Sequence, residues 1–226
     1  MEYINTLTAF FVNRINRFTA VVNVDGNDEI CHVKNTGRLK ELLKSGARVI
    51  LEKHDDAKRK TKYSLIAVKT ENGFVNIDSQ APNKVFYEWV KQGHFCDGVT
   101  LIKPETTYGN SRFDCYIEAG NRKIFVEVKG VTLNRDGVAL FPDAPTERGV
   151  KHLRELCKCT LDGYEAYIVF VAQMKGIHSF SPNIETHKEF GDALKECEKS
   201  RVNILCYDCI VTESTLKIDN KIPIKL

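Results

Sequence analysis

The sequence contains no long hydrophobic run. Its longest apolar stretch, Tyr167–Ala172, has the length of a single strand, whereas a helix that spans a membrane needs about 20 apolar residues. The chain starts with Met1-Glu2 and has no basic region before an apolar stretch, unlike a secretory signal. Internal repeats and low-complexity tracts are also absent. These absences predict a cytoplasmic protein that does not associate with a membrane.

Two motifs that often reveal a function are missing as well. No glycine-rich phosphate-binding loop is present, which disfavours a nucleotide-binding module. Cys206 and Cys209 have the spacing of zinc ligands, but no second CxxC exists and strand alternation places the two on opposite faces. Structural zinc is therefore disfavoured, and cysteines within apolar strand patterns are expected to be small buried hydrophobic residues.

A large net charge is absent, since the formal value is only +3. The excess lies in residues 1–80, which contain 13 Lys and Arg against 10 Asp and Glu, while residues 81–226 contain 20 of each. Within the first part, residues 58–63 form the basic run KRKTKY, which ends in an aromatic residue. Basic side chains along phosphates, with aromatic rings for base stacking, are how OB-type surfaces hold nucleic acid. A solvated loop is the alternative, because Asp55 and Asp56 partly cancel the field of the run.

The first part of the chain shows short alternating segments separated by turn residues, which predict strands. The predicted strands are Ala9–Arg14, Phe18–Val24, Glu29–Val33, Ala47–Glu52, Tyr63–Lys69 and Gly73–Ile77, with one or two helical turns at Arg38–Lys44. This pattern fits a small OB-like β-barrel, although a two-sheet sandwich would have the same pattern. Ser79–Asn83 is small and polar, and marks the expected boundary between domains of residues 1–80 and 81–226.

The second part alternates between amphipathic helices and apolar strands. The predicted helices are Asn83–Gln92, capped by Asn83, Thr146–Cys159 and Ile184–Arg201; the predicted strands are Val99–Lys103, Arg112–Glu118, Lys123–Val128, Tyr164–Ala172 and Ile204–Val211. Residues Asn134–Pro145 are expected to be a loop. The order predicts a mixed α/β fold with helices on both faces of a sheet.

Two carboxylates and a lysine are expected to converge in one hairpin. Alternating residues on either side of Gly120-Asn121 predict two paired strands joined by a type II′ turn. This register places Asp114 opposite Glu127, with Cβ atoms roughly 5 Å apart, and Lys129 on the same face. Like charges in direct opposition destabilise a sheet, so the pair could hold a cation. A solvated hairpin face is the alternative.

The predicted ligand set suits a hard divalent cation, Mg²⁺ or Mn²⁺. Asp114 and Glu127 would coordinate it, and Glu105, nine residues before Asp114, would be an accessory third ligand from a loop. A loop glutamate can equally face solvent. A dication held against a phosphate polarises the phosphorus centre and lowers the pKa of a water molecule. Lys129 could orient that water or stabilise developing negative charge, so Asp114, Glu127 and Lys129 are the predicted catalytic residues.

The order Asp114, a strand turn, then Glu127-Val128-Lys129 resembles the PD-(D/E)xK signature of restriction-endonuclease-like nucleases, without a proline before the aspartate. A longer resemblance is carried by the runs GNSRFDCYIE, VEVKGVTL and FPDAPTERGVKHLREL, together with RINRF and KNTGRL nearer the start. These runs resemble the sugar fermentation stimulation protein (SfsA) family along most of the chain. The resemblance implies a DNA-binding protein with an N-terminal OB-like domain, a C-terminal nuclease-like domain and a role in regulating sugar catabolism, maltose in particular.

Nucleic-acid contacts are expected from basic residues in both parts of the chain. The helix Thr146–Cys159 presents polar residues, including His152, opposite its apolar stripe, and a solvated helix face is the alternative to phosphate contact. The predicted contact residues are Lys58, Arg59, Lys60, Lys62, Arg14, Arg17, Arg38, Arg148 and Lys151. Charge and stacking hold the backbone largely without reading bases, so DNA and RNA both fit.

These features predict a nucleic-acid-binding protein with a metal-dependent nuclease-like domain that hydrolyses phosphodiester bonds. A non-catalytic DNA-binding regulator of sugar catabolism is the main alternative, and a sugar- or nucleotide-binding module is a third. One such site cuts one strand, so cleavage of both strands would favour a homodimer.

Overall fold

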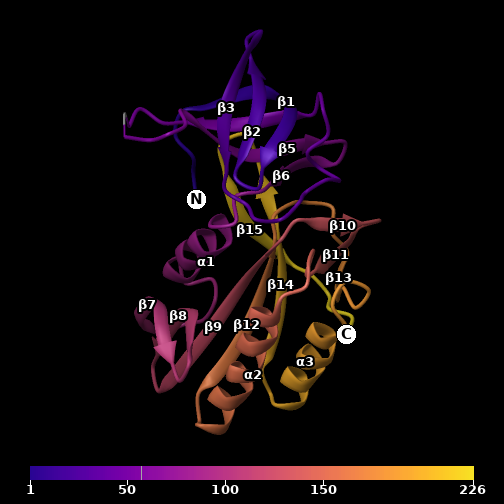
Figure 1. The fold of residues 1–226 in the computed structure, drawn as a ribbon. Coiled ribbons are helices and arrows are strands. Elements are labelled where there is room, and N and C mark those ends of the chain that lie inside the picture. The colour runs from indigo at the N-terminus through magenta and orange to yellow at the C-terminus, as the bar shows by residue number, and fades with distance from the viewer. Residues whose placement is uncertain (57) are drawn as a thin grey trace.

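The computed structural model describes residues 1–56 and 58–226, and consists of a β-barrel stacked on a layered α/β unit (Figure 1). The barrel contains the first six strands, and the α/β unit contains the three helices and the remaining strands. Within the described residues, no helix has the length and apolar character needed to cross a bilayer.

The barrel closes through a parallel pairing of its third and fifth strands. Its strands are β1 Thr6–Asn16, β2 Thr19–Val24, β3 Asn27–Val33, β4 Arg48–Lys53 and β5 Tyr63–Thr70, followed by β6 Gly73–Asn76. They follow the order β3-β2-β1-β4-β5-β6, and Cys31–Val33 of β3 also pair with Tyr63–Leu65 of β5. This closure makes a five-stranded OB-type barrel and excludes the two-sheet sandwich that the sequence also allowed. The segment expected to form one or two helical turns, Arg38–Lys44, contains a single turn, in which the Leu43 N–H donates to the Leu39 carbonyl at 2.8 Å.

The α/β unit is built on a six-stranded mixed sheet of order β15-β14-β12-β9-β8-β7. The strands are β7 Val99–Tyr108, β8 Ser111–Ala119, β9 Arg122–Val131, β12 Glu165–Ala172, β14 Asn203–Val211 and β15 Leu216–Lys221. Helix α1 (Ala81–Lys91) packs on one face, and α2 (Glu147–Leu161) and α3 (Lys188–Lys199) pack on the other. The central strand β12 is parallel to both neighbours and buried on both faces, as its continuous apolar run predicted.

A small third sheet replaces the loop expected at Asn134–Pro145. It contains β10 Leu133–Arg135, β11 Val138–Phe141 and β13 Ser179–Pro182. Strand β11 pairs in parallel with β13, which lies far along the chain, so local alternation could not predict it. The first strand of the α/β unit is also longer than expected, because β7 continues through Pro104 and Glu105. It lies at a sheet edge, where a proline is tolerated.

Buried polar groups join the barrel to the α/β unit. The Gln173 side chain, which follows β12, donates hydrogen bonds to Asn76 Oδ1 at 2.8 Å and to the Asp78 carbonyl at 3.1 Å. Asn76 in turn donates to the Tyr3 hydroxyl at 3.0 Å. The start of the chain lies beside β15, since the Tyr3 N–H donates to the Ser214 carbonyl at 2.7 Å. Residues from both units therefore form one buried network.

Replacing Gln173 by Ala should destabilise the protein by about 2 kcal/mol, because it removes two buried hydrogen bonds, to Asn76 Oδ1 and to the Asp78 carbonyl. Gln92→Ala, at an exposed position, should change the free energy of unfolding by no more than about 0.5 kcal/mol. Equilibrium urea denaturation measures both values, and equal effects of the two substitutions would contradict this role of Gln173.

Candidate active site

The hairpin formed by β8 and β9 has the predicted register. Glu118 pairs with Lys123, and Ala119 pairs with Arg122. Gly120 has a φ of +59°, which the first position of a type II′ turn requires and which glycine adopts without steric cost. The turn therefore sets the register that brings the carboxylates to the opposite end of the hairpin.

The two strands part at the predicted carboxylates. Their ladder ends with Cys115 opposite Val126, one pair before Asp114 and Glu127. Asp114 Oδ2 instead accepts a hydrogen bond of 2.8 Å from the Val128 backbone N–H. The side chain thus satisfies a donor that a strand carbonyl would otherwise satisfy. Asp114 and Glu127 are consequently not the regular cross-strand pair that the sequence predicted, although the register leads to them.

Helix α1 supplies a partner for Asp114 that the sequence analysis missed. Asn83 Nδ2 donates to Asp114 Oδ1 at 2.7 Å. The helix begins at Ala81, so Asn83 lies inside its first turn and is not the cap that was predicted. Burial, with the charge of Glu127 as the next cause, raises the pKa of Asp114 from 3.8 to about 6. No local sequence pattern links Asn83 to a strand 31 residues away.

Glu127 is buried, with 1% of its surface exposed. Its Oε1 atom is 2.5 Å from His152 Nδ1 and also accepts a hydrogen bond from Lys129 Nζ. Burial alone would raise the pKa of Glu127, but the hydrogen bond with His152 and the charge of Lys129 outweigh it and hold the pKa below its usual value. Its Oε2 atom is buried and has no hydrogen-bond partner among the described residues.

This donor set fits a hard divalent cation. A buried carboxylate oxygen without a partner costs on the order of 1–3 kcal/mol, so such atoms are rare in native proteins. Glu127 Oε2 is an atom of this kind, and the charge of Glu127 helps to raise the pKa of a second carboxylate, Asp114. Mg²⁺ and Mn²⁺ prefer carboxylate oxygens, and ligation would satisfy the orphaned atom and relieve the repulsion.

Glu105 lies near this site but is held by another residue. It is exposed in β7, with a φ of +52°, and its carboxylate is 3.5 Å from Arg112 Nη1. Glu105 and Asp114 line one cavity of about 340 Å³, together with Asn83, Lys84, Phe86, Tyr87, Pro104, Cys115 and Val128. Its role as a third ligand stays a prediction.

A separate group of possible ligands lies at the start of α2 and α3. Glu147, His187 and Glu189 bring three ligand atoms within 4.8 Å of one another, and no other trio among the described residues does so. Both glutamates are exposed, and Glu189 forms an ion pair of 2.9 Å with Arg154. This exposed group provides an independent comparison for metal-binding measurements.

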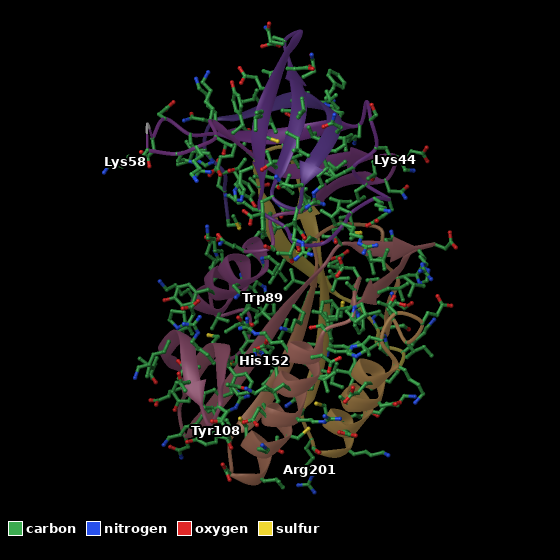
Figure 2. The ribbon with its side chains drawn as sticks, in the orientation of Figure 1. Lys44, Lys58, Trp89, Tyr108, His152 and Arg201 are labelled. Atoms are coloured by element: carbon green, nitrogen blue, oxygen red, sulfur yellow. The ribbon has the colours of Figure 1, made fainter. Side chains whose placement is uncertain are left out.

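His152 lies on helix α2, and its side chain points toward Glu127 of β9 (Figure 2). His152 is 5% exposed, so the expectation of a surface histidine was wrong, and Glu155 on the same side is also buried. Arg148 and Lys151 are exposed as predicted. Arg148 Nε lies 3.4 Å from His152 Nε2, so a cationic side chain adjoins the carboxylate site.

The basic residues of the barrel differ in availability. Arg17 and Arg38 are exposed, whereas the Arg14 guanidinium donates to a cluster of backbone carbonyls, those of Asn16, Arg17, Asn35, Gly37 and Arg38. Arg14 therefore holds the loop after β3, which leaves its donors committed. Lys58, Lys60 and Lys62 are exposed, but Arg59 donates to Ser64 Oγ at 2.9 Å. Their contact with nucleic acid stays a prediction.

Two family models match the chain: "SfsA N-terminal OB domain" over residues 12–77 and "Sugar fermentation stimulation protein RE domain" over residues 80–215. A sugar fermentation stimulation protein homolog from Clostridium beijerinckii is 55% identical and covers 100% of both chains. A homolog from Desulfitobacterium hafniense is 58% identical and covers 100% of this chain and 99% of its own. Pyrococcus furiosus SfsA, solved in complex with Ca²⁺, is 28% identical with a TM-score of 0.91, covering 100% of this chain and 98% of that chain. The family resemblance and the barrel-plus-α/β fold are confirmed.

The raised pKa of Asp114 predicts a pH dependence of stability. The folded carboxyl keeps its proton up to about pH 6, but the unfolded one releases it near 3.8. Folding therefore takes up a proton between these values, and stability falls as pH rises through the window. Without metal, the stability of wild type relative to Asp114→Asn should fall by up to about 3 kcal/mol between about pH 3 and pH 7, because only the wild-type carboxyl has to ionise. Thermal or urea unfolding across pH measures it. Asp97→Asn, at an exposed position, is the control. A pH-independent difference between Asp114→Asn and wild type would refute the assignment.

Proposed function

Since the chain belongs to the sugar fermentation stimulation protein family, we propose that it binds nucleic acid and hydrolyses phosphodiester bonds with a divalent metal ion held by Asp114 and Glu127. The observation that carries the proposal is the buried, unpartnered Oε2 atom of Glu127, whose other oxygen contacts Lys129 and whose charge helps to raise the pKa of Asp114. Mg²⁺ or Mn²⁺ is the proposed ion. A relative of the same fold was solved with Ca²⁺, which is also a hard cation with oxygen ligands.

The residues around the carboxylates divide the tasks of such a site. A bound dication supplies polarisation of a phosphate oxygen and acidifies a water molecule. His152 holds Glu127 Oε1, which leaves Oε2 as the free ligand atom, and Asn83 and the Val128 N–H fix the orientation of Asp114. Lys129, whose ammonium contacts Glu127, is positioned to orient a water molecule or to stabilise negative charge that develops on the phosphate.

The proposal accounts for the opposite pKa shifts of the two carboxyls. Glu127 is held ionised by His152 and Lys129, whereas Asp114 is pushed toward the protonated form by burial and by Glu127. A dication would favour ionisation of Asp114, because an opposite charge lowers a carboxyl pKa. Metal binding should therefore release protons near pH 6, and should weaken as the pH falls.

Calorimetric titration with Mn²⁺ tests the ligands. Asp114→Asn and Glu127→Gln should each lower the affinity at least about 10-fold, because each removes a charged oxygen ligand. Glu118→Gln on β8 is the matched control and should bind like wild type. Glu189→Gln distinguishes the exposed group at α2 and α3: loss of binding in this variant, with binding retained in Asp114→Asn, would place the ion there and defeat the proposed site.

Cleavage assays on labelled single- and double-stranded DNA and RNA with Mn²⁺ test the reaction. Lys129→Ala should reduce the rate by at least about 100-fold, because it removes the positive charge next to Glu127. Retention of nucleic acid should change little, and Lys123→Ala, an exposed lysine on the same strand, should cleave normally. A wild-type protein that retains DNA but cleaves none of the four substrates would favour the non-catalytic regulator.

A further inference from the structure

The fold separates the basic residues of the barrel into two groups. One group is the loop residues Lys58, Lys60 and Lys62. The other, which we call the groove group, is Arg17, Arg38 and Lys40. Figure 2 shows Lys58 on one side of the barrel and Lys44 on the opposite side. Leu43 and Ser45, the neighbours of Lys44, line the groove described next.

The loop group has little besides charge to offer a nucleic acid. Tyr63, the aromatic residue at its end, is 7% exposed and forms part of the barrel core, so its ring is not available for base stacking. Arg59, in the middle of the loop, donates to Ser64 Oγ. The exposed carboxylates Asp55 and Asp56 precede the loop and oppose its charge.

The groove group lines a cavity of about 690 Å³ that both structural units form. Arg14, Arg17, Arg38 and Lys40 contribute its charges, and none of the described lining residues is acidic. Ala144, in the segment before α2, lines the same cavity. Arg14 builds the wall, because its bonds to the carbonyls of the Asn35–Arg38 loop hold that loop in place.

A second, smaller cavity adjoins the groove. It has a volume of about 120 Å³ and shares Thr36 and Gly37 with the groove. At its other side it is lined by Gly130, the residue after Lys129. A Cβ atom on Gly37 would lie 2.6 Å from Asp143 Oδ2, so the two units meet closely here. A Cβ atom on Gly130 would likewise lie 2.5 Å from Gln173 Oε1 and 2.6 Å from Pro82 Cγ, so packed side chains fill the space beside Gly130.

Beyond Ala144, helix α2 presents two further exposed basic residues. The helix starts at Glu147 and presents Arg148 and Lys151 to solvent. Arg148 reaches His152, which contacts Glu127. Phe18, next to Arg17, is 50% exposed and offers an aromatic face for a base at the outer end of the groove.

We propose that a single strand of nucleic acid lies in this groove, with its phosphates on Arg17, Arg38 and Lys40. This inference rests on the proposed function, since it assigns the path of that substrate. It gives the loop group no part in holding the strand. Asp143 is the single carboxylate among the described residues that line either cavity, and it opposes phosphate binding along this path.

Fluorescence anisotropy with a labelled oligothymidylate, without added metal, tests the path. The combined variant Arg17→Ala/Arg38→Ala/Lys40→Ala should bind at least about 10-fold more weakly, and the slope of log affinity against log salt should fall by about 2. The control variant Lys58→Ala/Lys60→Ala/Lys62→Ala should stay within about threefold of wild type. All six side chains are exposed, and matching thermal unfolding will verify that both variants are folded.

Asp143→Asn provides a gain of binding that a merely damaged protein cannot mimic. Asp143 lies against Gly37, which lines the groove. Removing its charge should tighten retention by about threefold, because that charge repels phosphate. The proposed path is overturned if the loop variant loses as much affinity as the groove variant, or if Asp143→Asn gains none. In either case, binding by the wild-type protein leaves the proposed function standing. A wild-type protein that binds no oligonucleotide overturns both.

Discussion

The hydrogen bond from the Val128 N–H to the Asp114 carboxylate is the contact on which the site depends. It allows β8 and β9 to separate without leaving a strand donor unsatisfied. The separation places one carboxylate against α1, through Asn83, and leaves the other against α2, through His152. A regular ladder would have continued past these residues and filled the space with paired backbone. One side chain therefore acts both as a backbone partner and as a site residue.

Burying two carboxylates next to each other imposes a cost that the structure distributes unequally. Glu127 is fully enclosed, yet His152 and Lys129 keep it ionised. Asp114 is half-buried and has a raised pKa, so it carries the unfavourable part of the interaction. Opposite pKa shifts within a carboxylate pair are typical of functional sites, because a structural pair could be replaced without such strain. The proposed dication would offset this cost, because a positive charge favours the ionised form of Asp114.

Charge in the sequence did not indicate which basic side chains are free. Arg14 and Arg17 lie three residues apart, but Arg14 is committed to backbone carbonyls and Arg17 is exposed. The run of residues 58–63 is the densest in positive charge, yet its tyrosine is buried in the barrel. Availability depends on what each guanidinium or ammonium contacts after folding, and these contacts come from segments distant in sequence.

Local chemistry in the sequence determined the strand pattern and the turn at Gly120 with its register, because alternation and turn residues act over a few positions. It also determined that two acids and a lysine lie near the end of one hairpin. Only the tertiary structure decided the closure of the barrel through β3 and β5 and the pairing of β11 with β13. It also decided the partners Asn83 and His152 and the separation of the strands at Asp114. These features join residues that are tens of positions apart. No local periodicity encodes such contacts, because they follow from which surfaces pack together.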